Sequence, residues 1–199
     1  MKQSIMCAAV LVAGLLASSA CSSKGTASVP TSQSNAAQSN SQATGELRYK
    51  APDGWVKEQT TSSMRVAQYK LPKTEGDPED ALLVLYFFGP TQGGAVQANI
   101  DRWISQMQQP DGSASKDKAR TETSTVNGLK ITSVDVSGTY TAEMAPGTPG
   151  QRNDANYRMR AAVVETPKGN YFLKIVGPAK TMDHWEQSVT DFVKSVEFK

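Results

Sequence analysis

The stretch Ala81-Leu-Leu-Val-Leu-Tyr-Phe-Phe88 is apolar at every position and is closed by Gly89-Pro90. A strand with one solvated face alternates apolar and polar residues, whereas a strand covered on both faces reads as a continuous apolar run. We therefore place this segment at the centre of a sheet, with further layers above and below it.

Two segments carry the residue spacing of an amphipathic helix. Apolar side chains recur at steps of three and four between residues 94 and 110 and again between residues 185 and 196. The two sets are Val96, Ile100, Trp103, Ile104 and Met107, and then Trp185, Val189, Phe192, Val193 and Val196. Thr181 or Asp183 is the expected N-cap of the second helix. We expect both helices to pack on the sheet.

A first hairpin is predicted from the pair Asn127-Gly128, which readily takes the positive backbone angles of a type I′ turn. It joins residues 120–126 with residues 129–140. Within the second of these strands, the apolar residues change from odd to even positions. This change of parity predicts a bulge near Thr132 and Ser133, because one apolar pair would otherwise face water.

A second hairpin is predicted between residues 157–165 and residues 170–176. Proline presets the first turn residue and glycine takes a left-handed conformation, so that Pro167-Lys168-Gly169 is read as a three-residue loop. The register that follows sets Val163 against Leu173 and matches apolar residues across the two strands.

Read in chain order, the elements are three strands, a helix, two hairpins and a helix. This order predicts the α+β class, with a mainly antiparallel sheet of about six or seven strands and amphipathic helices packed on it. Three segments resemble the PsbP/Mog1 type of α/β/α sandwich, and the resemblance spans most of residues 47–199. They are Ala51-Pro-Asp-Gly-Trp55, Gly169-Asn-Tyr-Phe-Leu-Lys174, and the last helix with Trp185 followed by Phe192-Val-Lys-Ser-Val196. The resemblance implies a photosystem accessory protein or a binder of small proteins rather than an enzyme.

The N-terminal region contains the three parts of a secretory signal. Lys2 precedes a short apolar run from Ile5 to Leu16, and small residues then lead to Cys21. The run of about 12 residues is shorter than the ~20 that a helix needs to cross a bilayer. The pattern resembles the lipobox of bacterial lipoproteins, in which the cysteine is acylated and becomes the mature N-terminus, although Ser18 stands where leucine is usual. The alternative is an ordinary secretory signal cut near Ala20.

The same resemblance indicates a location and a domain organisation. Ser22 stands where aspartate favours retention in the inner membrane, so we expect the outer membrane, with the protein facing the periplasm. We expect a signal peptide at residues 1–20, the lipidated cysteine and a tether at 21–45, and a globular domain at 46–199. The tether holds one large aliphatic residue, Val29, and buries too little apolar area to offset the entropy of ordering.

Composition argues against several classes of activity. The chain has 21 Lys and Arg residues against 19 Asp and Glu residues, a net charge of +2 that provides no field for holding nucleic acid. Its single histidine, His184, and the absence of cysteine after Cys21 argue against a zinc site and against a Ser-His-Asp triad. We expect no catalytic residue, cofactor or metal. An enzyme that uses two carboxylates is a third alternative.

Two features remain as candidates for binding. The segment from Thr141 to Ala155 is long for a hairpin link and is either a binding element or an idle connection. Arg158 and Arg160 lie on one face of the following strand, where they either grip an acidic partner or form a solvated edge. The leading hypothesis is a membrane-anchored periplasmic lipoprotein that binds or assembles envelope proteins without catalysis. The alternative is a carrier of a small apolar ligand, with a pocket between sheet and helix.

Replacing Cys21 by serine is expected to move the protein from the membrane fraction to the soluble periplasmic fraction. The acyl chains, at ~0.8 kcal/mol per buried methylene, supply the anchorage and cannot be attached to serine. Cell fractionation checks this result, with Cys7→Ser as the matched control that should leave the protein membrane-bound. Unchanged fractionation of Cys21→Ser, together with processing that is insensitive to globomycin, would contradict the anchor.

Overall fold

The computed structural model describes residues 45–60, 62–142 and 150–199. The signal peptide, the acylation of Cys21 and the tether before residue 45 lie outside the described residues and stay predictions. The described residues belong to one structural unit. No helix in the described ranges is both long enough and apolar enough to cross a membrane.

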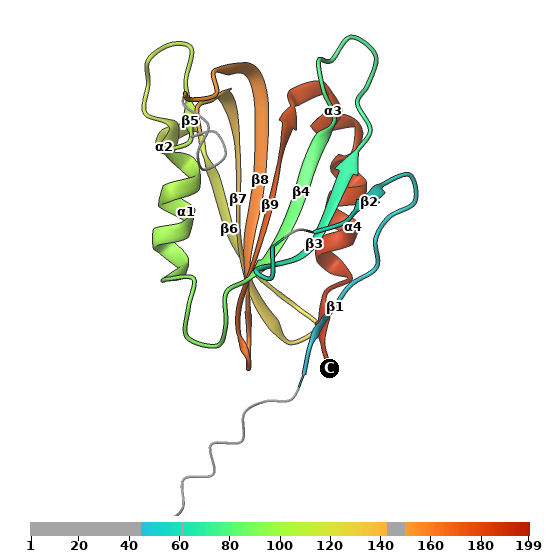
Figure 1. Ribbon diagram of the computed structural model, residues 1–199. Coiled ribbons are helices and arrows are strands. Elements are labelled where there is room, and N and C mark those ends of the chain that lie inside the picture. The colour runs from blue at the N-terminus through green and yellow to red at the C-terminus, as the bar shows by residue number, and fades with distance from the viewer. Residues whose placement is uncertain (1–44, 61, 143–149) are drawn as a thin grey trace, which may run out of the picture. The chain divides into compact units, whose positions relative to one another are not determined.

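Strands dominate the described part, with short helices on both sides of them (Figure 1). The strands are β1 Leu47–Arg48, β2 Val56–Glu58, β3 Arg65–Leu71, β4 Ala81–Phe87, β5 Met107–Gln108, β6 Arg120–Val126, β7 Leu129–Tyr140, β8 Asp154–Thr166, β9 Gly169–Pro178 and β10 Glu197–Phe198. The helices are α1 Val96–Ile104, α2 Ser115–Lys118, α3 Ala179–His184 and α4 Glu186–Lys194.

The main sheet has eight strands in the order β2-β3-β4-β9-β8-β7-β5, and β6 pairs with β7 beside β5. Its strand pairs are antiparallel. The short strands β1 and β10 form a separate two-stranded sheet. The predicted α+β class is confirmed, and β4 lies in the interior of the sheet between β3 and β9. The strand number slightly exceeds the predicted one because the two-residue strand β5 extends the β7 edge.

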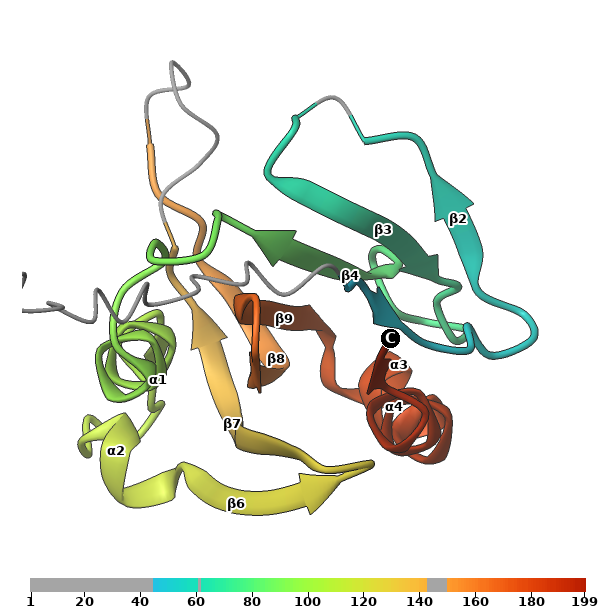
Figure 2. The same cartoon turned by 90° about the horizontal axis from the view of Figure 1, so that it is seen from below.

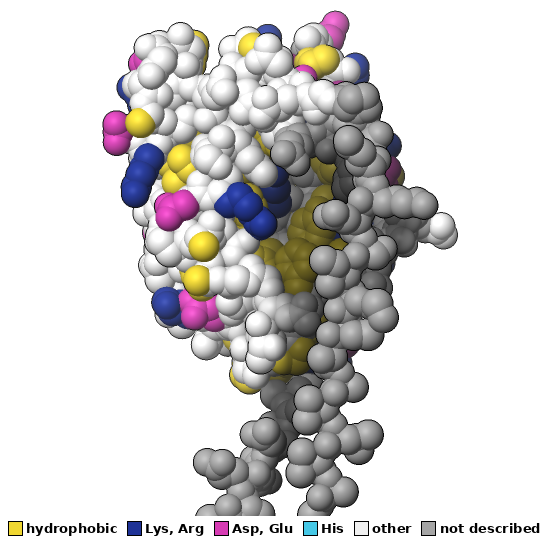
Figure 3. Space-filling model, turned by 60° about the vertical axis from the view of Figure 1, so that its left-hand side comes forward, with side chains coloured by type: hydrophobic (Ala, Val, Ile, Leu, Met, Phe, Trp, Pro, Cys, Tyr) yellow, Lys and Arg dark blue, Asp and Glu magenta, His cyan; other side chains and the backbone are white. Residues whose placement is uncertain are grey.

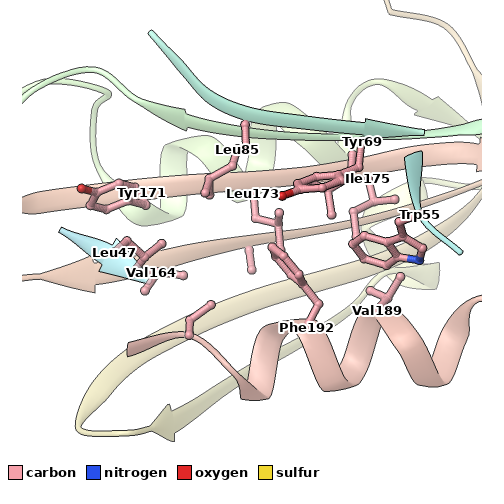
Figure 4. Packing of buried hydrophobic residues seen from close by; sticks show 14 of the residues in the cluster. Leu47, Trp55, Tyr69, Leu85, Val164, Tyr171, Leu173, Ile175, Val189 and Phe192 are labelled. Atoms are coloured by element: carbon pink, nitrogen blue, oxygen red, sulfur yellow. The ribbon is translucent and has the colours of Figure 1, made fainter. Parts of the chain in front are cut away.

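Both faces of the sheet are covered, as the continuous apolar run of β4 predicts. α1 and α4 lie on opposite sides of the sheet (Figure 2). One core cluster packs under α4 around Tyr69, Leu173 and Phe192 (Figure 4). The other packs under α1 around Trp103 and Met159. Alternate residues of the central strands therefore enter two different cores.

The predicted bulge near Thr132 and Ser133 is wrong. β7 pairs with β8 in an unbroken register from Lys130 to Gly138, and the register shifts only after Gly138. The apolar residues at odd positions, such as Ile131, belong to the α4 cluster, and those at even positions, such as Val134, belong to the α1 cluster. Because both faces are buried, the change of parity leaves no apolar pair in water and requires no bulge.

The two hairpin predictions have different outcomes. Asn127 and Gly128 have φ values of 49° and 82°, which confirms the first turn. The second hairpin has a two-residue loop, with Thr166 paired with Gly169 and Val163 paired with Phe172 rather than with Leu173. Val163 faces an apolar residue in either register, because both faces of β9 are buried at this point. The apolar pattern therefore does not distinguish the two registers.

The helices lie where the spacing predicted them, with different ends. The first ends at Ile104, and Met107 belongs to strand β5. The second begins at Glu186, and Trp185 occupies its N-cap position without a side-chain capping hydrogen bond. The predicted caps are wrong, because Thr181 and Asp183 lie inside the preceding helix α3.

Gly177→Ala is expected to destabilise the domain by about 2–3 kcal/mol through overpacking. A Cβ at Gly177 would lie 2.6 Å from the Cα of Ala81, so that β9 and β4 would have to separate. Gly112→Ala is the matched control, because its Cβ meets nothing within 4 Å and only its φ of +73° resists the change, at about 1 kcal/mol. Denaturant unfolding measures both values, and equal losses would contradict the close strand contact.

Candidate functional site

A groove with a volume of about 690 Å³ lies between α4 and β6. Strands β7, β8 and β9 form its floor, and α4 and β6 form its walls. Volumes of this order are typical of ligand sites. Figure 2 shows β6 and α4 at the two sides of the concave face of the sheet.

The depth of the groove follows from small side chains on its floor. Ser133 of β7 and Ala162 of β8 are cross-strand partners, so that neither strand fills the space at this point. The helix does not fill it either, because Phe192 of α4 packs against Trp55 and Tyr49, away from β6. β6 is exposed along nearly its whole length, as its sequence Arg-Thr-Glu-Thr-Ser-Thr-Val predicts.

The lining combines an apolar floor with a polar rim. The apolar lining residues are Val126, Val134, Ala161, Ala162, Leu173, Ile175, Val189 and Val193. The charged lining residues are Arg120, Glu122, Asp135, Arg158, Arg160, Glu186 and Lys194. Such a surface buries apolar groups along its floor and orients polar groups at its edge.

Arg158, one of the two predicted partner-binding residues, is held by carboxylates of this chain. Its Nε and Nη2 donate to the two oxygens of Asp135 at 2.9 and 2.6 Å. Its Nη1 donates to Asp183 at 2.6 Å, and Nη2 also donates to Glu186 at 2.9 Å. Hydrogen bonding to Asp135, with Glu186 and Asp183, raises the pKa of Arg158 against the opposing effect of burial. Arg158 therefore ties β8 to β7 and to both C-terminal helices.

Arg160, the other predicted residue, is held mainly by neutral oxygens. Its Nη1 donates to the carbonyl oxygen of Glu186 at 3.1 Å, and its Nη2 donates to Oγ1 of Thr190 at 3.3 Å. Its ion pair with Asp135 is long, with 3.7 Å between Nε and Oδ2. Burial lowers the pKa of the guanidinium. Arg160 thus places an incompletely neutralised cation at one end of the groove, and partner binding by this residue stays a prediction.

The predicted loop from Thr141 to Ala155 is described only in part, and residues 143–149 lie outside the described residues. In its described part, Arg152 hydrogen-bonds to Glu79 and Asp154. Tyr157 donates its hydroxyl to Glu79 at 2.7 Å. Burial opposes ionisation of Glu79, but the hydrogen bonds from Tyr157 and Arg152 lower its pKa overall.

Carboxylates of the turn at residues 75–80 are also hydrogen-bonded to other groups of this protein. Hydrogen bonds from the side chain and backbone N–H of Thr181 lower the pKa of Asp77. Asp80 accepts a hydrogen bond from the backbone N–H of Lys73 at 2.9 Å. Among the described residues, no three His, Cys, Asp or Glu side chains are arranged to hold a metal ion. His184 is exposed and lies edge-on to Trp185.

Comparison with known proteins finds no family model and no curated protein that matches this chain. Solved structures that resemble it include the following three. PA94 of Pseudomonas aeruginosa, a protein of unknown function, has 12% identity and a TM-score of 0.43, over 71% of this chain and 94% of that one. LpqN, involved in cell envelope biogenesis of Mycobacterium tuberculosis, has 11% identity and a TM-score of 0.48, over 78% and 84%. Cyanobacterial PsbP of Synechocystis sp. PCC 6803 has 10% identity and a TM-score of 0.43, over 77% and 92%.

Arg158→Met is expected to lower the free energy of unfolding by about 2 kcal/mol. Removing one partner of a buried ion pair typically costs more, but Asp183 and Glu186 are 64% and 55% exposed and keep their hydration. Arg48→Met is the matched control, because its pair with Glu46 is exposed on both sides and is expected to contribute less than about 0.5 kcal/mol. Similar losses in the two variants, measured by urea unfolding, would show that Arg158 does not tie these elements together.

Proposed function

We propose that this domain is a non-enzymatic binding module of the bacterial cell envelope. The N-terminal sequence pattern supports anchorage through Cys21, and the open groove between α4 and β6 supports binding by the folded part. The groove accommodates a segment of a partner protein, in line with the leading hypothesis from the sequence. The open groove is the observation that carries this proposal.

The hydrogen-bonding state of β6 favours a protein segment as the occupant. Among the described residues, β6 pairs with β7 alone, from Arg120 to Val126, and it borders the groove. An edge strand offers unpaired backbone N–H and C=O groups to a second chain, and an extended segment recognises them by strand addition. Alternate side chains of such a segment then reach the floor around Ala162 and Leu173.

The charges of the groove indicate what the segment carries. Its centre is apolar, and Arg160 stands at one end, where a long ion pair with Asp135 is its one ion pair within the described part of the chain. A segment with apolar residues for the floor and an acidic residue for Arg160 matches this arrangement. The acidic group would neutralise Arg160 together with Asp135, whose Oδ2 lies 3.7 Å from Nε of Arg160.

A photo-crosslinking residue at Ser124, on the groove side of β6, is expected to yield one dominant adduct in cells. The same residue at Lys57, on the exposed strand β2, is the matched control and is expected to yield none. Ser133→Leu fills the floor and is expected to reduce the adduct at Ser124 at least about tenfold, which corresponds to about 1.4 kcal/mol of binding free energy. Circular dichroism of purified Ser133→Leu confirms that the variant folds.

Equal crosslinking from Ser124 and Lys57, or an adduct that survives in folded Ser133→Leu, would contradict recognition in the groove.

The apolar floor also favours a second candidate function, a carrier of a small apolar ligand, which is the alternative expected from the sequence. Native mass spectrometry of the protein purified from its own envelope distinguishes the two. A small bound molecule that is present in the wild type and absent from Ser133→Leu would support the carrier, whereas a bare wild-type protein would oppose it.

A further inference from the structure

Lys174 of β9 lies on the α1 side of the sheet, opposite to the groove. Its cross-strand neighbours are Val84 of β4 and Ala161 of β8, both buried. Its Nζ donates to Oε1 of Gln106 at 2.5 Å and to the hydroxyl oxygen of Tyr140 at 3.0 Å. An ammonium has three N–H donors, and these two oxygens account for two of them.

No carboxylate of the described residues forms an ion pair with Lys174. Its charged neighbours are instead Arg102 of α1 and Arg152, and both oppose its charge. Arg152 is neutralised by Glu79 and Asp154, whereas the guanidinium of Arg102 donates, among the described residues, only to the neutral side-chain oxygen of Asn99, at 2.7 Å. The local charge is therefore positive, in a place where burial makes a charge costly.

Tyr140 supplies a second donor beside Lys174. Its hydroxyl oxygen accepts the hydrogen bond from Lys174, and no hydrogen bond from its own proton is found to another described residue, so that this proton can be donated. Its ring stacks on that of Tyr157 with the centroids 6.3 Å apart, so that the position of the hydroxyl is well defined.

Aromatic side chains border this position on the β4 side. Tyr86 lies two residues after Val84 and therefore on the same face as Lys174. It stacks on Phe88 with the ring centroids 5.7 Å apart, and both rings are partly exposed. On the side of the molecule that carries α1, Figure 3 shows a hollow with a hydrophobic floor and with Lys or Arg side chains along its edge.

We propose that Lys174, Tyr140 and Arg102 form a binding site for a small organic carboxylate, whose apolar body lies against Tyr86 and Phe88. The carboxylate accepts hydrogen bonds from Nζ of Lys174 and from the hydroxyl of Tyr140, and Arg102 adds a further positive charge. A carboxylate is the complement of one ammonium and one hydroxyl donor, and the aromatic pair selects an organic anion over an inorganic one. This site is independent of the groove, which lies on the other face of the sheet.

The site has a pH dependence with a defined sign. Burial, with Arg102 and Arg152, lowers the pKa of Lys174 to about 8. The other titratable groups around it are Tyr140, whose pKa is raised by burial, Tyr86, and the carboxylates of Glu79 and Asp154 that neutralise Arg152. A bound carboxylate favours the ammonium form and so raises the pKa of Lys174. The carboxylate is therefore held tightly below about pH 8 and is released as the pH rises above it.

The test uses NMR of protein labelled with ¹³C-lysine, in which the Cε resonance of Lys174 reports its titration. Saturating benzoate is expected to raise the pKa of Lys174 by at least about one unit, equivalent to at least about tenfold tighter binding to the ammonium form. Inorganic phosphate, which lacks an apolar body, is expected to cause a much smaller shift. An unchanged titration in benzoate, or an equal shift in phosphate, would overturn the proposal.

Lys174→Met provides a second measurement that does not depend on the label. Removal of the buried ammonium is expected to leave the melting temperature at about pH 7 equal or higher, while the stabilisation by benzoate is lost. The wild type becomes more stable as the pH rises from about 8 towards the ordinary value of lysine, because only the unfolded chain is then protonated. The excess in melting temperature of Lys174→Met over the wild type should therefore shrink across that pH range.

Two controls isolate the site. Lys116→Met removes an exposed lysine of α2 and is expected to keep the benzoate response. Ser133→Leu fills the groove on the opposite face and is also expected to keep it, so that failure of the carboxylate site and failure of the groove are distinguishable. Stabilisation of Lys174→Met by benzoate to the wild-type extent would overturn the assignment of Lys174.

Discussion

Burial of the central strands on both faces is the constraint on which the rest of the structure depends. β4, β8 and β9 send alternate side chains into two separate cores, and each core needs its own cover. α1 supplies one cover through Trp103, and α4 supplies the other through Phe192. Neither helix is long, so each covers only part of its face. The parts of each face that these helices leave uncovered include the two proposed binding surfaces, the groove between α4 and β6 and the surface around Lys174.

Three cations on the central strands show how differently a charge can be accommodated next to these cores. Arg158 is surrounded by three carboxylates and serves to join elements of the fold. Arg160 is held by neutral oxygens and one long ion pair. Lys174 contacts two neutral oxygens and has two arginines as charged neighbours. Since an uncompensated buried charge is unfavourable, an anion bound at either of the last two would stabilise the protein.

The two hairpins show which features the residue pattern predicts and which it does not. The turn at Asn127-Gly128 was predicted because its backbone angles are a local property of the two residues. The predicted register of β8 against β9 differs by one residue from the observed one, because Val163 has an apolar partner in either arrangement. The predicted bulge failed for the same reason, since Ile131 and Val134 enter different cores. Alternation reports register only when one face is exposed.

The sequence by itself determined the α+β class, the interior position of Ala81–Phe87, the approximate places of the two amphipathic helices and the tight turn at Asn127. These features depend on local spacing and on the conformational preferences of single residues. Only the tertiary structure decided that Ser133 and Ala162 meet on the floor of a groove, and that Lys174 lies beside Tyr140 with no carboxylate partner among the described residues. These contacts join residues far apart in the chain. Strand register and helix placement create them, and no local pattern encodes either.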